Sequence, residues 1–328
     1  MTAATQTTTA SRTEADGHRG TGWADLVWIT WRQHRLALAG TGGLLVLTAV
    51  LMVVFGLTVR PVGRYGEFDR SLLDLTQYAI PGYAALIAVF WAAPLLAREY
   101  EQRTHLLAWG QDVSPLRWLT GKTAVLAGVA VVYAVVLGLV SSWLMHRLRA
   151  VLPDWPLIRP FSGHGFESSP LLQAGYALFG FALGLAVSAI SRRTVVSMGI
   201  TLALFAGIRV FVIENLRPYF MTPVRSVFPL GAEFRPGGRD DLFVGGGMLD
   251  AAGNEVDPAR CAMPVGPDGD PYLCERQAGA VSHFVDVQPA DRLAAFQLIE
   301  FGLFAALAVV LAVVTWRVMR RSPAGSVG

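Results

Sequence analysis

Residues 36–59, LALAGTGGLLVLTAVLMVVFGLTV, form an apolar stretch of 24 residues without a single charge. The hydrocarbon core of a bilayer is about 30 Å thick and is crossed by about 20 helical residues. Lipid offers no partners for free backbone groups, so a single segment that crosses it must be helical. Residues 36–59 are therefore predicted to form a transmembrane helix.

Five more stretches meet the same criterion, which makes the predicted fold an all-α polytopic membrane protein with six transmembrane helices. The composition agrees, because 53% of the residues are hydrophobic and only 16% are charged, whereas a soluble domain carries about 25% charged residues. Residues 36–213 are expected to hold the first five helices and residues 291–317 the sixth. The five further stretches are residues 78–97, 123–144, 171–190, 195–213 and 293–316.

The segments outside these helices have distinct compositions. Residues 1–22 are polar and rich in threonine, which predicts a disordered tail, and they lack the pattern of a cleaved secretion signal. In residues 23–35, Trp23, Val27 and Trp31 recur every four positions and basic residues follow. This pattern predicts a helix in the inner membrane interface; the alternative is that the segment extends the first span. Residues 318–328 form a second tail.

Basic residues near the span ends predict the orientation. Eleven of them fall on the side of the two termini and six on the other side, and cytoplasmic loops carry the excess of basic residues. Both termini are therefore expected in the cytoplasm. Lys122 is the only lysine among the 27 basic residues, which fits a high-GC bacterial coding bias and hence a bacterial plasma membrane. The net charge of +3 does not indicate a nucleic-acid partner.

The long segment 214–290 then faces outward and is expected to form a large extracellular loop or a small subdomain. It holds the only two cysteines, Cys261 and Cys274, and paired cysteines belong in an oxidising compartment. A disulfide would close a loop of about 14 residues and contribute about 3 kcal/mol; the alternative is two unrelated thiols. The acidic residues of this segment lack the spacing of a calcium-binding loop, so no metal site is expected.

Two features inside the spans are singled out. Gly180, Gly184 and Ser188 recur every four residues in the fourth span, and small residues at this spacing let two helices approach closely. A neighbour within the chain is favoured over a dimer interface.

Arg209 and Glu300 are ionisable groups at membrane depth, both roughly 10 Å below the outer surface by the helical rise. They are predicted to form an ion pair, with structural neutralisation favoured over substrate contact.

Catalytic motifs are absent from the sequence. There is no H-E-x-x-H zinc motif and no G-x-S-x-G nucleophile elbow, so no catalytic residue is expected. Gly121-Lys122-Thr123 looks like the end of a phosphate-binding loop, but Leu116 stands where that loop needs a glycine. The chain is therefore not expected to bind ATP itself.

The predicted cytoplasmic segment 98–122 has a clear order of signals. Charged residues end the second span. Thr104 can cap a short helix that runs to Trp109, and Gly110 suits its C-terminal end. Ser114-Pro115 then provides an N-cap followed by proline at the first helical position, which restarts the chain toward the third span. A short helix is thereby presented to the cytoplasm.

This segment resembles the second-to-third-span loop of ABC-transporter permeases of the type-2 exporter class, in a branch common in high-GC bacteria. The resemblance rests on Arg98-Glu99-Tyr100-Glu101-Gln102, on Thr104-His105-Leu106-Leu107-Ala108-Trp109 and on Arg117-Trp118. Two further signatures agree, Trp28-Ile29-Thr30-Trp31-Arg32-Gln33-His34-Arg35 before the first span and Gln288-Pro289-Ala290-Asp291-Arg292 with Phe296-Gln297-Leu298-Ile299-Glu300 at the sixth. One departure is Arg103, where the pattern usually has glycine.

The resemblance implies a mechanism in which two six-span permeases, identical or different, face each other and each rests on a separate cytoplasmic ATPase. The short loop helix would dock on that ATPase. ATP and Mg would be bound by the ATPase, and this chain would hold no cofactor. The residues assigned to the contact or to anchoring the loop are Arg98, Glu99, Glu101, Thr104, Trp109, Arg117 and Trp118. The alternative for Arg98, Arg117 and Trp118 is that they only mark the membrane interface.

The expected function is that of a permease subunit of an ATP-driven ABC exporter that moves a lipophilic small molecule. The alternative is an ATP-independent secondary transporter or channel. That class places ionisable residues at the membrane midplane and often repeats its halves, and neither feature is clear here. A membrane-embedded enzyme is disfavoured by the missing motifs.

Overall fold

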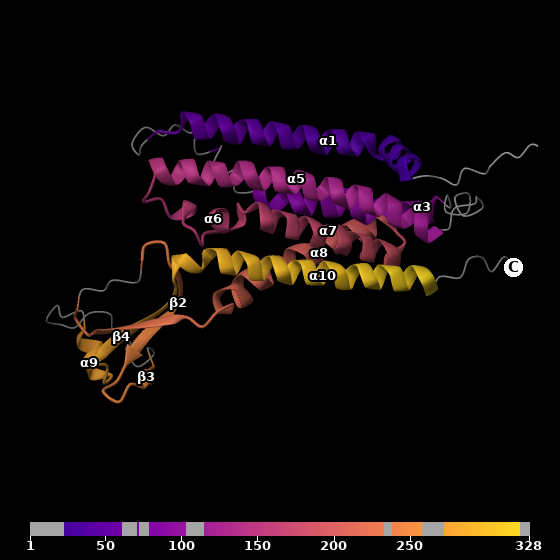
Figure 1. Ribbon diagram of the computed structural model, residues 1–328. Helices are drawn as coiled ribbons and strands as arrows, with labels where there is room; N and C mark the ends of the chain where they lie inside the picture. Colours follow the sequence, from indigo (N-terminus) through magenta and orange to yellow (C-terminus); the bar gives the residue numbers. More distant parts are fainter. Residues whose placement is uncertain are drawn as a thin grey trace, which may run out of the picture.

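The computed structural model describes residues 23–60, 71, 79–102, 115–232, 238–257 and 272–321. Within these residues, six helices are long and apolar enough to cross a membrane, which confirms the predicted fold of six transmembrane helices; the segment between the fifth and sixth spans departs from the all-α expectation. Figure 1 shows them side by side in one bundle, with the Trp23 end of α1 and the Arg321 end of α10 at the same end of it. The six spans are Val27–Thr58, Ala79–Glu101, Leu119–Val151, Pro170–Ser191, Thr194–Tyr219 and Ala290–Arg321.

Most spans are longer than the apolar stretches that predicted them. The first, third, fourth and sixth are the α-helices α1 (Trp23–Thr58), α5 (Pro115–Val151), α7 (Pro170–Ser191) and α10 (Leu293–Arg321). The predicted sixth helix ends at residue 317, whereas α10 continues to Arg321, because arginines at a helix end extend to the interface without breaking the helix. Residues 1–22 and 322–328 lie outside the described residues.

The first helix is continuous from Trp23 to Thr58. Residues 23–35 are therefore the beginning of the same helix that forms the first span, as in the alternative interpretation. Trp28 and Trp31 remain 59% and 55% exposed, which suits side chains that favour the headgroup region. How this part of α1 lies relative to a membrane stays a prediction.

The second and fifth spans change their hydrogen-bond pattern along their length. In the second span, residues 79–87 are α-helical, the π-helix η1 covers Ala88–Ala92, and α3 covers Ala93–Glu101. In the fifth span, α8 (Thr194–Phe211) passes into the π-helix η3 (Val212–Leu216) and the 3₁₀-helix η4 (Arg217–Tyr219). A proline follows each π-helix within two residues, at Pro94 and Pro218.

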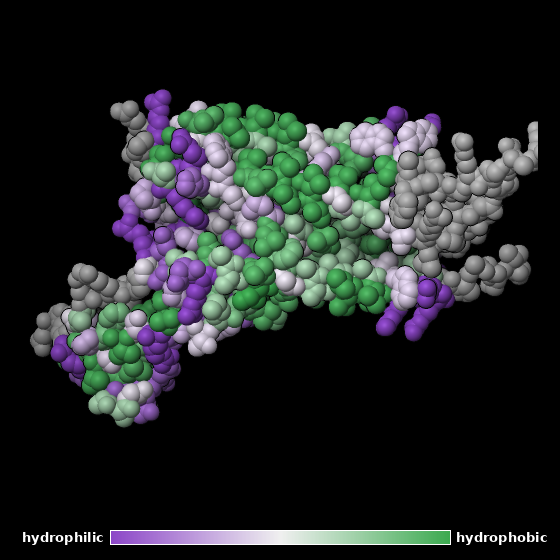
Figure 2. Space-filling model, viewed as in Figure 1, coloured by the Kyte–Doolittle hydropathy of each residue, from purple (hydrophilic) through white to green (hydrophobic). Residues whose placement is uncertain are grey.

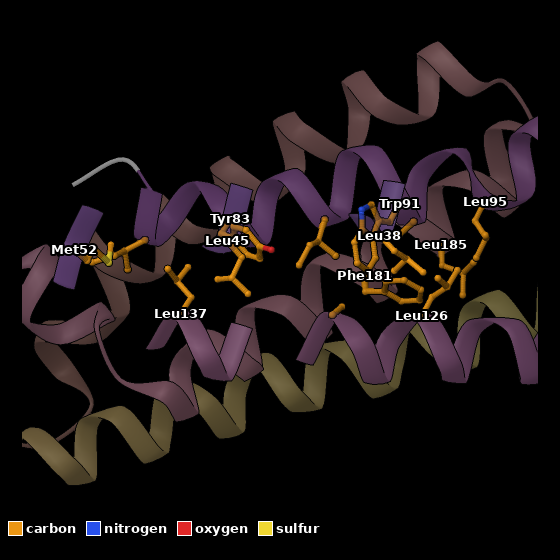
Figure 3. Close-up of a cluster of buried hydrophobic side chains, with 14 of the residues drawn as sticks. Leu38, Leu45, Met52, Tyr83, Trp91, Leu95, Leu126, Leu137, Phe181 and Leu185 are labelled. Carbon is orange, nitrogen blue, oxygen red and sulfur yellow. The ribbon is translucent and has the colours of Figure 1, made fainter. Parts of the chain in front are cut away.

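Helix α7 is at the centre of the bundle, with 78% of its spanning window buried, and it contacts α3, α5, α8 and α10. One apolar cluster lies between α1, the second span, α5 and α7, and Figure 3 shows Leu38, Leu126 and Phe181 among its members. A second cluster joins α7, α8 and α10 through Phe179, Phe205 and Phe304. On the face of the bundle that Figure 2 shows, apolar residues (green) cover the middle and polar residues (purple) gather toward the two ends.

The connection between the third and fourth spans contains the 3₁₀-helix η2 (Pro156–Ile158) and the short helix α6 (Gly163–Glu167). Ser162 caps α6 by accepting a hydrogen bond from Gly165 N at 3.1 Å. A Cβ atom at Gly165 would lie 2.0 Å from Arg159 O, so only glycine fits this turn. Helix α6 is thereby fixed against the bundle and presents Glu167 to it.

The segment between the fifth and sixth spans forms an antiparallel four-stranded sheet of order β1-β4-β2-β3 that projects beyond the bundle (Figure 1). This sheet was not expected from the sequence. Its strands are β1 (Val224–Pro229), β2 (Leu242–Leu249), β3 (Glu255–Val256) and β4 (Ser282–Gln288). The short helices α9 (Leu273–Gln277) and η6 (Ala290–Arg292) flank β4. Cys261 lies outside the described residues, so its disulfide with Cys274 stays a prediction.

The sheet is tied to the bundle through Gln288 at the end of β4. This fully buried side chain donates hydrogen bonds from Nε2 to Pro218 O at 3.0 Å and to Met221 O at 2.5 Å. Val224 of β1 is paired with Val287 of β4. The end of the fifth span and the start of the sixth are therefore held together by strand pairing and by this side chain.

Candidate functional site

Four charged side chains meet in the half of the bundle nearest the sheet, and we call them the charge cluster: Glu167 of α6, Arg209 of α8, Arg217 of η4 and Glu300 of α10. Each side chain is at most 7% exposed. Arg217 donates from Nε to Glu300 Oε2 and from Nη2 to Glu300 Oε1, both at 2.8 Å. Arg209 donates from Nη2 to Glu167 Oε1, and Arg217 Nη2 lies 3.7 Å from the same oxygen. Two positive charges thus balance two negative ones.

Aromatic side chains complete the surroundings of the cluster. Tyr176 of α7 donates a hydrogen bond to Glu300 Oε1 at 2.5 Å, and the guanidinium carbon of Arg209 lies 3.7 Å from the centre of the Tyr176 ring. The guanidinium carbon of Arg217 lies 4.0 Å from the centre of the Phe166 ring. Cation–π contacts are strongest where water is excluded, so these rings help to offset the cost of burying the charges.

The π-helix η3 positions Arg217. In this wider turn the N–H of Arg217 donates to Val212 O, five residues back. Pro218 follows and has no N–H, so the helix cannot continue in its regular pattern. The chain turns here into η4 and β1. Arg217 thereby ends the fifth span with its side chain directed into the bundle and not toward the membrane surface.

The predicted ion pair between Arg209 and Glu300 is wrong, because each residue pairs with a different partner. Both residues belong to the charge cluster, but the structure pairs Arg209 with Glu167 and Glu300 with Arg217. Glu167 and Arg217 were missed because each lies just outside the apolar stretch that predicted its neighbouring span. Extending those stretches by one helical turn would have included both. Gln297, expected to share the network, instead donates to Phe166 O at 3.0 Å.

A cavity of about 480 Å³ adjoins the charge cluster, between the second span, α6 and the fifth span. Glu167, Arg209 and His164 supply its polar lining, and the remaining walls are mostly apolar. Nη1 of Arg209 is buried and has no hydrogen-bond partner among the described residues. The apolar walls include Ile80, Ala85, Leu202, Phe205, Val210 and Ile213.

At the opposite end of the bundle, the last residues of the second span contact several other spans. Lys122 Nζ lies 2.8 Å from Glu99 Oε1, and only 6% of Lys122 is exposed. Glu101 accepts hydrogen bonds from Thr194 N at 2.9 Å and from Thr194 Oγ1 at 2.6 Å, and so caps α8. Tyr100 Oη donates to Met319 Sδ of α10 at 3.2 Å.

The structure describes only some of the residues assigned to the ATPase contact, and these differ in their surroundings. Glu99 and Glu101 bind partners within the chain, and Arg98 is exposed. Thr104 and Trp109 lie outside the described residues, as do the side chains of Arg117 and Trp118. The assignment of these seven residues to a partner contact stays a prediction.

The small residues of α7 lie against the second span. A Cβ atom at Gly184 would lie 2.6 Å from Ala88 O and 2.9 Å from Ala93 N, and one at Gly180 would lie 3.2 Å from Ala84 O. Ser188 Oγ accepts hydrogen bonds from Leu96 N at 3.2 Å and from Ala97 N at 2.7 Å. The close approach thus occurs within the chain, directly at the π-helix η1 and at Pro94.

Comparison with known protein families finds a match in the middle of the chain. Residues 60–217 match the model of a family described as ABC-2 membrane transporter related. No curated protein and no solved structure matches the chain. The matched region contains the second to fourth spans, α6 and nearly all of the fifth span, as well as the segment between the second and third spans that carries part of the resemblance. Together with six helices long and apolar enough to cross a membrane, this match supports an ABC-2 type permease and a multi-pass membrane protein.

Proposed function

We propose that the chain is the membrane-spanning subunit of an ATP-driven exporter and that a separate ATPase moves it through the segment between the second and third spans. The observation that carries this proposal is the set of contacts at the end of α3. Glu99, Tyr100 and Glu101 contact the third, sixth and fifth spans in turn. A force applied to the segment that follows α3 therefore acts on three other spans at once.

Such coupling requires an element whose contacts differ between two states of the protein. The second span suits this role because η1 interrupts its α-helical pattern at Ala88–Ala92. Segments of π-helix and prolines are the usual sites of helix bending. The inner part of the span, α3, can then change its angle while residues 79–87 keep their packing.

A separate ATPase is supported by the state of Lys122, the one lysine that could serve a phosphate-binding loop. Lys122 is buried and paired with Glu99, so its charge is already compensated. The proposal accordingly assigns ATP and Mg to the partner ATPase. We further propose a bacterial plasma membrane with both termini in the cytoplasm, a second permease copy or a related permease as the other half, and a lipophilic small molecule as cargo.

The test uses the full-length chain reconstituted in vesicles with a candidate ABC ATPase that co-purifies with it. The chain alone should hydrolyse no ATP, and the pair should accumulate a lipophilic dye in inside-out vesicles only when ATP is present. An ATPase that lacks its phosphate-loop lysine should abolish accumulation. Transport that persists without ATP would favour the secondary transporter instead.

Glu101→Ala tests the coupling contact in the same vesicles. Because the variant removes the cap that joins α3 to α8, ATP hydrolysis should continue while dye accumulation per ATP falls several-fold. Glu214→Ala is the matched control, since Glu214 is an exposed acid at the other end of the fifth span and should leave the ratio unchanged. An equal ratio in both variants would show that this contact does not transmit the movement.

A further inference from the structure

We propose that the cavity beside the charge cluster binds an uncharged amphiphile, with its apolar body against the second and fifth spans and its hydrogen-bond acceptor at Arg209. The inference deepens the proposed function, because it names the substrate class of the permease. It can be tested without transport, since binding requires neither the ATPase nor ATP.

The size and walls of the cavity suit a small molecule with an apolar body. Its volume of about 480 Å³ falls in the range of roughly 300–1,000 Å³ that small-molecule sites occupy. Ile80 and Ala85 form the wall on the second span, and Phe205 and Ile213 form part of the wall on the fifth. Most of the surface that a ligand would meet is therefore hydrocarbon.

The polar end of the cavity is formed by Arg209, Glu167 and His164, and Arg209 supplies a buried donor. Arg209 lines the cavity, and its buried Nη1 has no acceptor among the described residues. Glu167 also lines the cavity, and its Oε1 accepts from Arg209 and lies 3.7 Å from Arg217 Nη2. A buried donor without an acceptor is unfavourable, and a carbonyl, amide or hydroxyl oxygen of a ligand would satisfy it.

The charge balance of the cluster selects an uncharged ligand. Arg209 and Arg217 are matched by Glu167 and Glu300, so an anion or a cation in the cavity would bring a charge with no counter-ion. An isolated charge in such surroundings is strongly disfavoured. A neutral acceptor gains the hydrogen bond without this penalty.

Binding is tested by photolabelling of the full-length protein in phosphatidylcholine nanodiscs. Three probes share one diazirine-bearing twelve-carbon chain and differ in the head group, which is a primary amide, a carboxylate or a trimethylammonium. The amide should label peptides that contain Ala85 and Ala206, the labelling should saturate, and unlabelled dodecanamide should suppress it. The two charged probes should label these peptides much less. A diacylglycerol that carries the same diazirine serves as the lipid probe. Labelling of the same peptides by this probe would indicate a membrane lipid as the ligand, and its absence would indicate a free compound.

Two variants make the test specific. Ala206→Phe places a ring at the cavity and should reduce amide labelling to background. Ala203→Phe is the matched control, because it is an exposed alanine of the same helix that does not line the cavity. Arg209→Lys keeps the positive charge beside Glu167 but loses Nη1. It should weaken amide binding by roughly 2- to 10-fold, the value of one hydrogen bond, while gel filtration stays unchanged.

Several results would overturn the inference. Labelling by the carboxylate or the ammonium probe at the level of the amide would exclude a site selective for neutral molecules. Labelling that does not saturate, or that is equal in Ala206→Phe and Ala203→Phe, would show contact with bulk lipid only. If the protein binds the amide selectively but does not transport, the binding site is supported. That result would contradict only the proposed function.

Discussion

Arg217 donates two hydrogen bonds to the carboxylate of Glu300, and the two side chains are only 5% and 1% exposed. A buried pair of this kind contributes little to stability by comparison with apolar residues of the same size. Removing one partner is costly, however, because it leaves the other charge buried and uncompensated. The identity of the partners therefore decides which combinations of substitutions the chain tolerates.

The pairing predicts the outcome of single and double substitutions in the cluster. Glu300→Leu or Arg217→Leu alone should lower the free energy of unfolding by about 3–5 kcal/mol. The double variant Arg217→Leu/Glu300→Leu should recover most of this loss, because no unpaired charge remains between the two. Thermal unfolding of the purified protein in detergent measures the effect.

The control is the double variant Arg209→Leu/Glu300→Leu. It also removes one positive and one negative charge, but it leaves Glu167 and Arg217 in place. These two residues lie 3.7 Å apart and lack their closer partners, so this variant should recover less. Equal recovery in both double variants would show that stability depends on the net charge of the four residues and not on which residues are paired.

At the residue scale, the sequence indicated that ionisable groups lie in the membrane but did not identify their partners. Arg209 and Glu300 stood out because apolar residues surround them. Glu167 and Arg217 are flanked by residues typical of loops, so hydropathy alone placed them outside the spans. Their burial follows from α6 and η4 folding back against the bundle, which depends on contacts far apart in the sequence.

The second span and α7 approach each other most closely at Gly184. Backbone atoms of Ala88 and Ala93 occupy the space that a side chain would need, and backbone yields less readily than a flexible side chain. Directly below, Ser188 supplies an acceptor to two amides of α3. The contact therefore fixes the point at which the second span changes from π- to α-helix.

This contact predicts a strong effect from a single methyl group. Gly184→Ala should destabilise the protein by about 1–3 kcal/mol, because overpacking forces the two backbones apart. Gly199→Ala in α8 is the matched control, since a Cβ atom there meets nothing within 4 Å. It should be neutral or slightly stabilising. The unfolding temperatures of the two variants, measured in the same detergent, test this prediction. Equal temperatures would contradict it.

The strand pair β1–β4 carries an ion pair whose contribution depends on pH. Arg225 donates to Asp286 Oδ1 at 2.9 Å and to Oδ2 at 2.7 Å, and these hydrogen bonds lower the pKa of Asp286. A depressed pKa in the folded state adds stability above the unfolded pKa of about 3.9, and this stability is lost as the pH falls through the folded pKa.

Asp286→Asn should therefore increase amide hydrogen exchange in β1 and β4 modestly at pH 7, because the pair is partly exposed and screened by solvent. The difference from the unchanged protein should shrink as the pH falls below about 4 and through the lowered pKa of folded Asp286, below which neither protein carries the charge. Exchange read by mass spectrometry on peptides of the two strands gives the comparison. A difference that persists unchanged at low pH would assign the effect to packing and not to charge.

At the scale of elements, the sequence predicted the spans well and the sheet not at all. The number and order of the spans follow from the thickness of the bilayer and the lack of hydrogen-bond partners in it. The strands are short, and Gly245, Gly246 and Gly247 interrupt the alternation that marks a strand in β2. The π-helices were also missed, because propensity does not distinguish them from α-helix.

For the whole molecule, the proposed orientation predicts which surfaces a membrane-impermeant reagent can reach. In a background without Cys261 and Cys274, Ala251→Cys should be labelled by an impermeant maleimide on intact cells. Gln102→Cys should be labelled only after the membrane is opened. Both positions are exposed and lie at opposite ends of the bundle, so the reverse pattern would invert the topology.

Strand β1 leaves the fifth span and β4 leads into the sixth, and the two strands are paired side by side. Gln288 fastens the same corner to the end of the fifth span. The sheet therefore cannot tilt without carrying both helix ends. An antibody fragment raised against it would serve as a landmark for aligning single-particle images of this 35.4 kDa chain, and its tilt would report the movement of the two helices beneath.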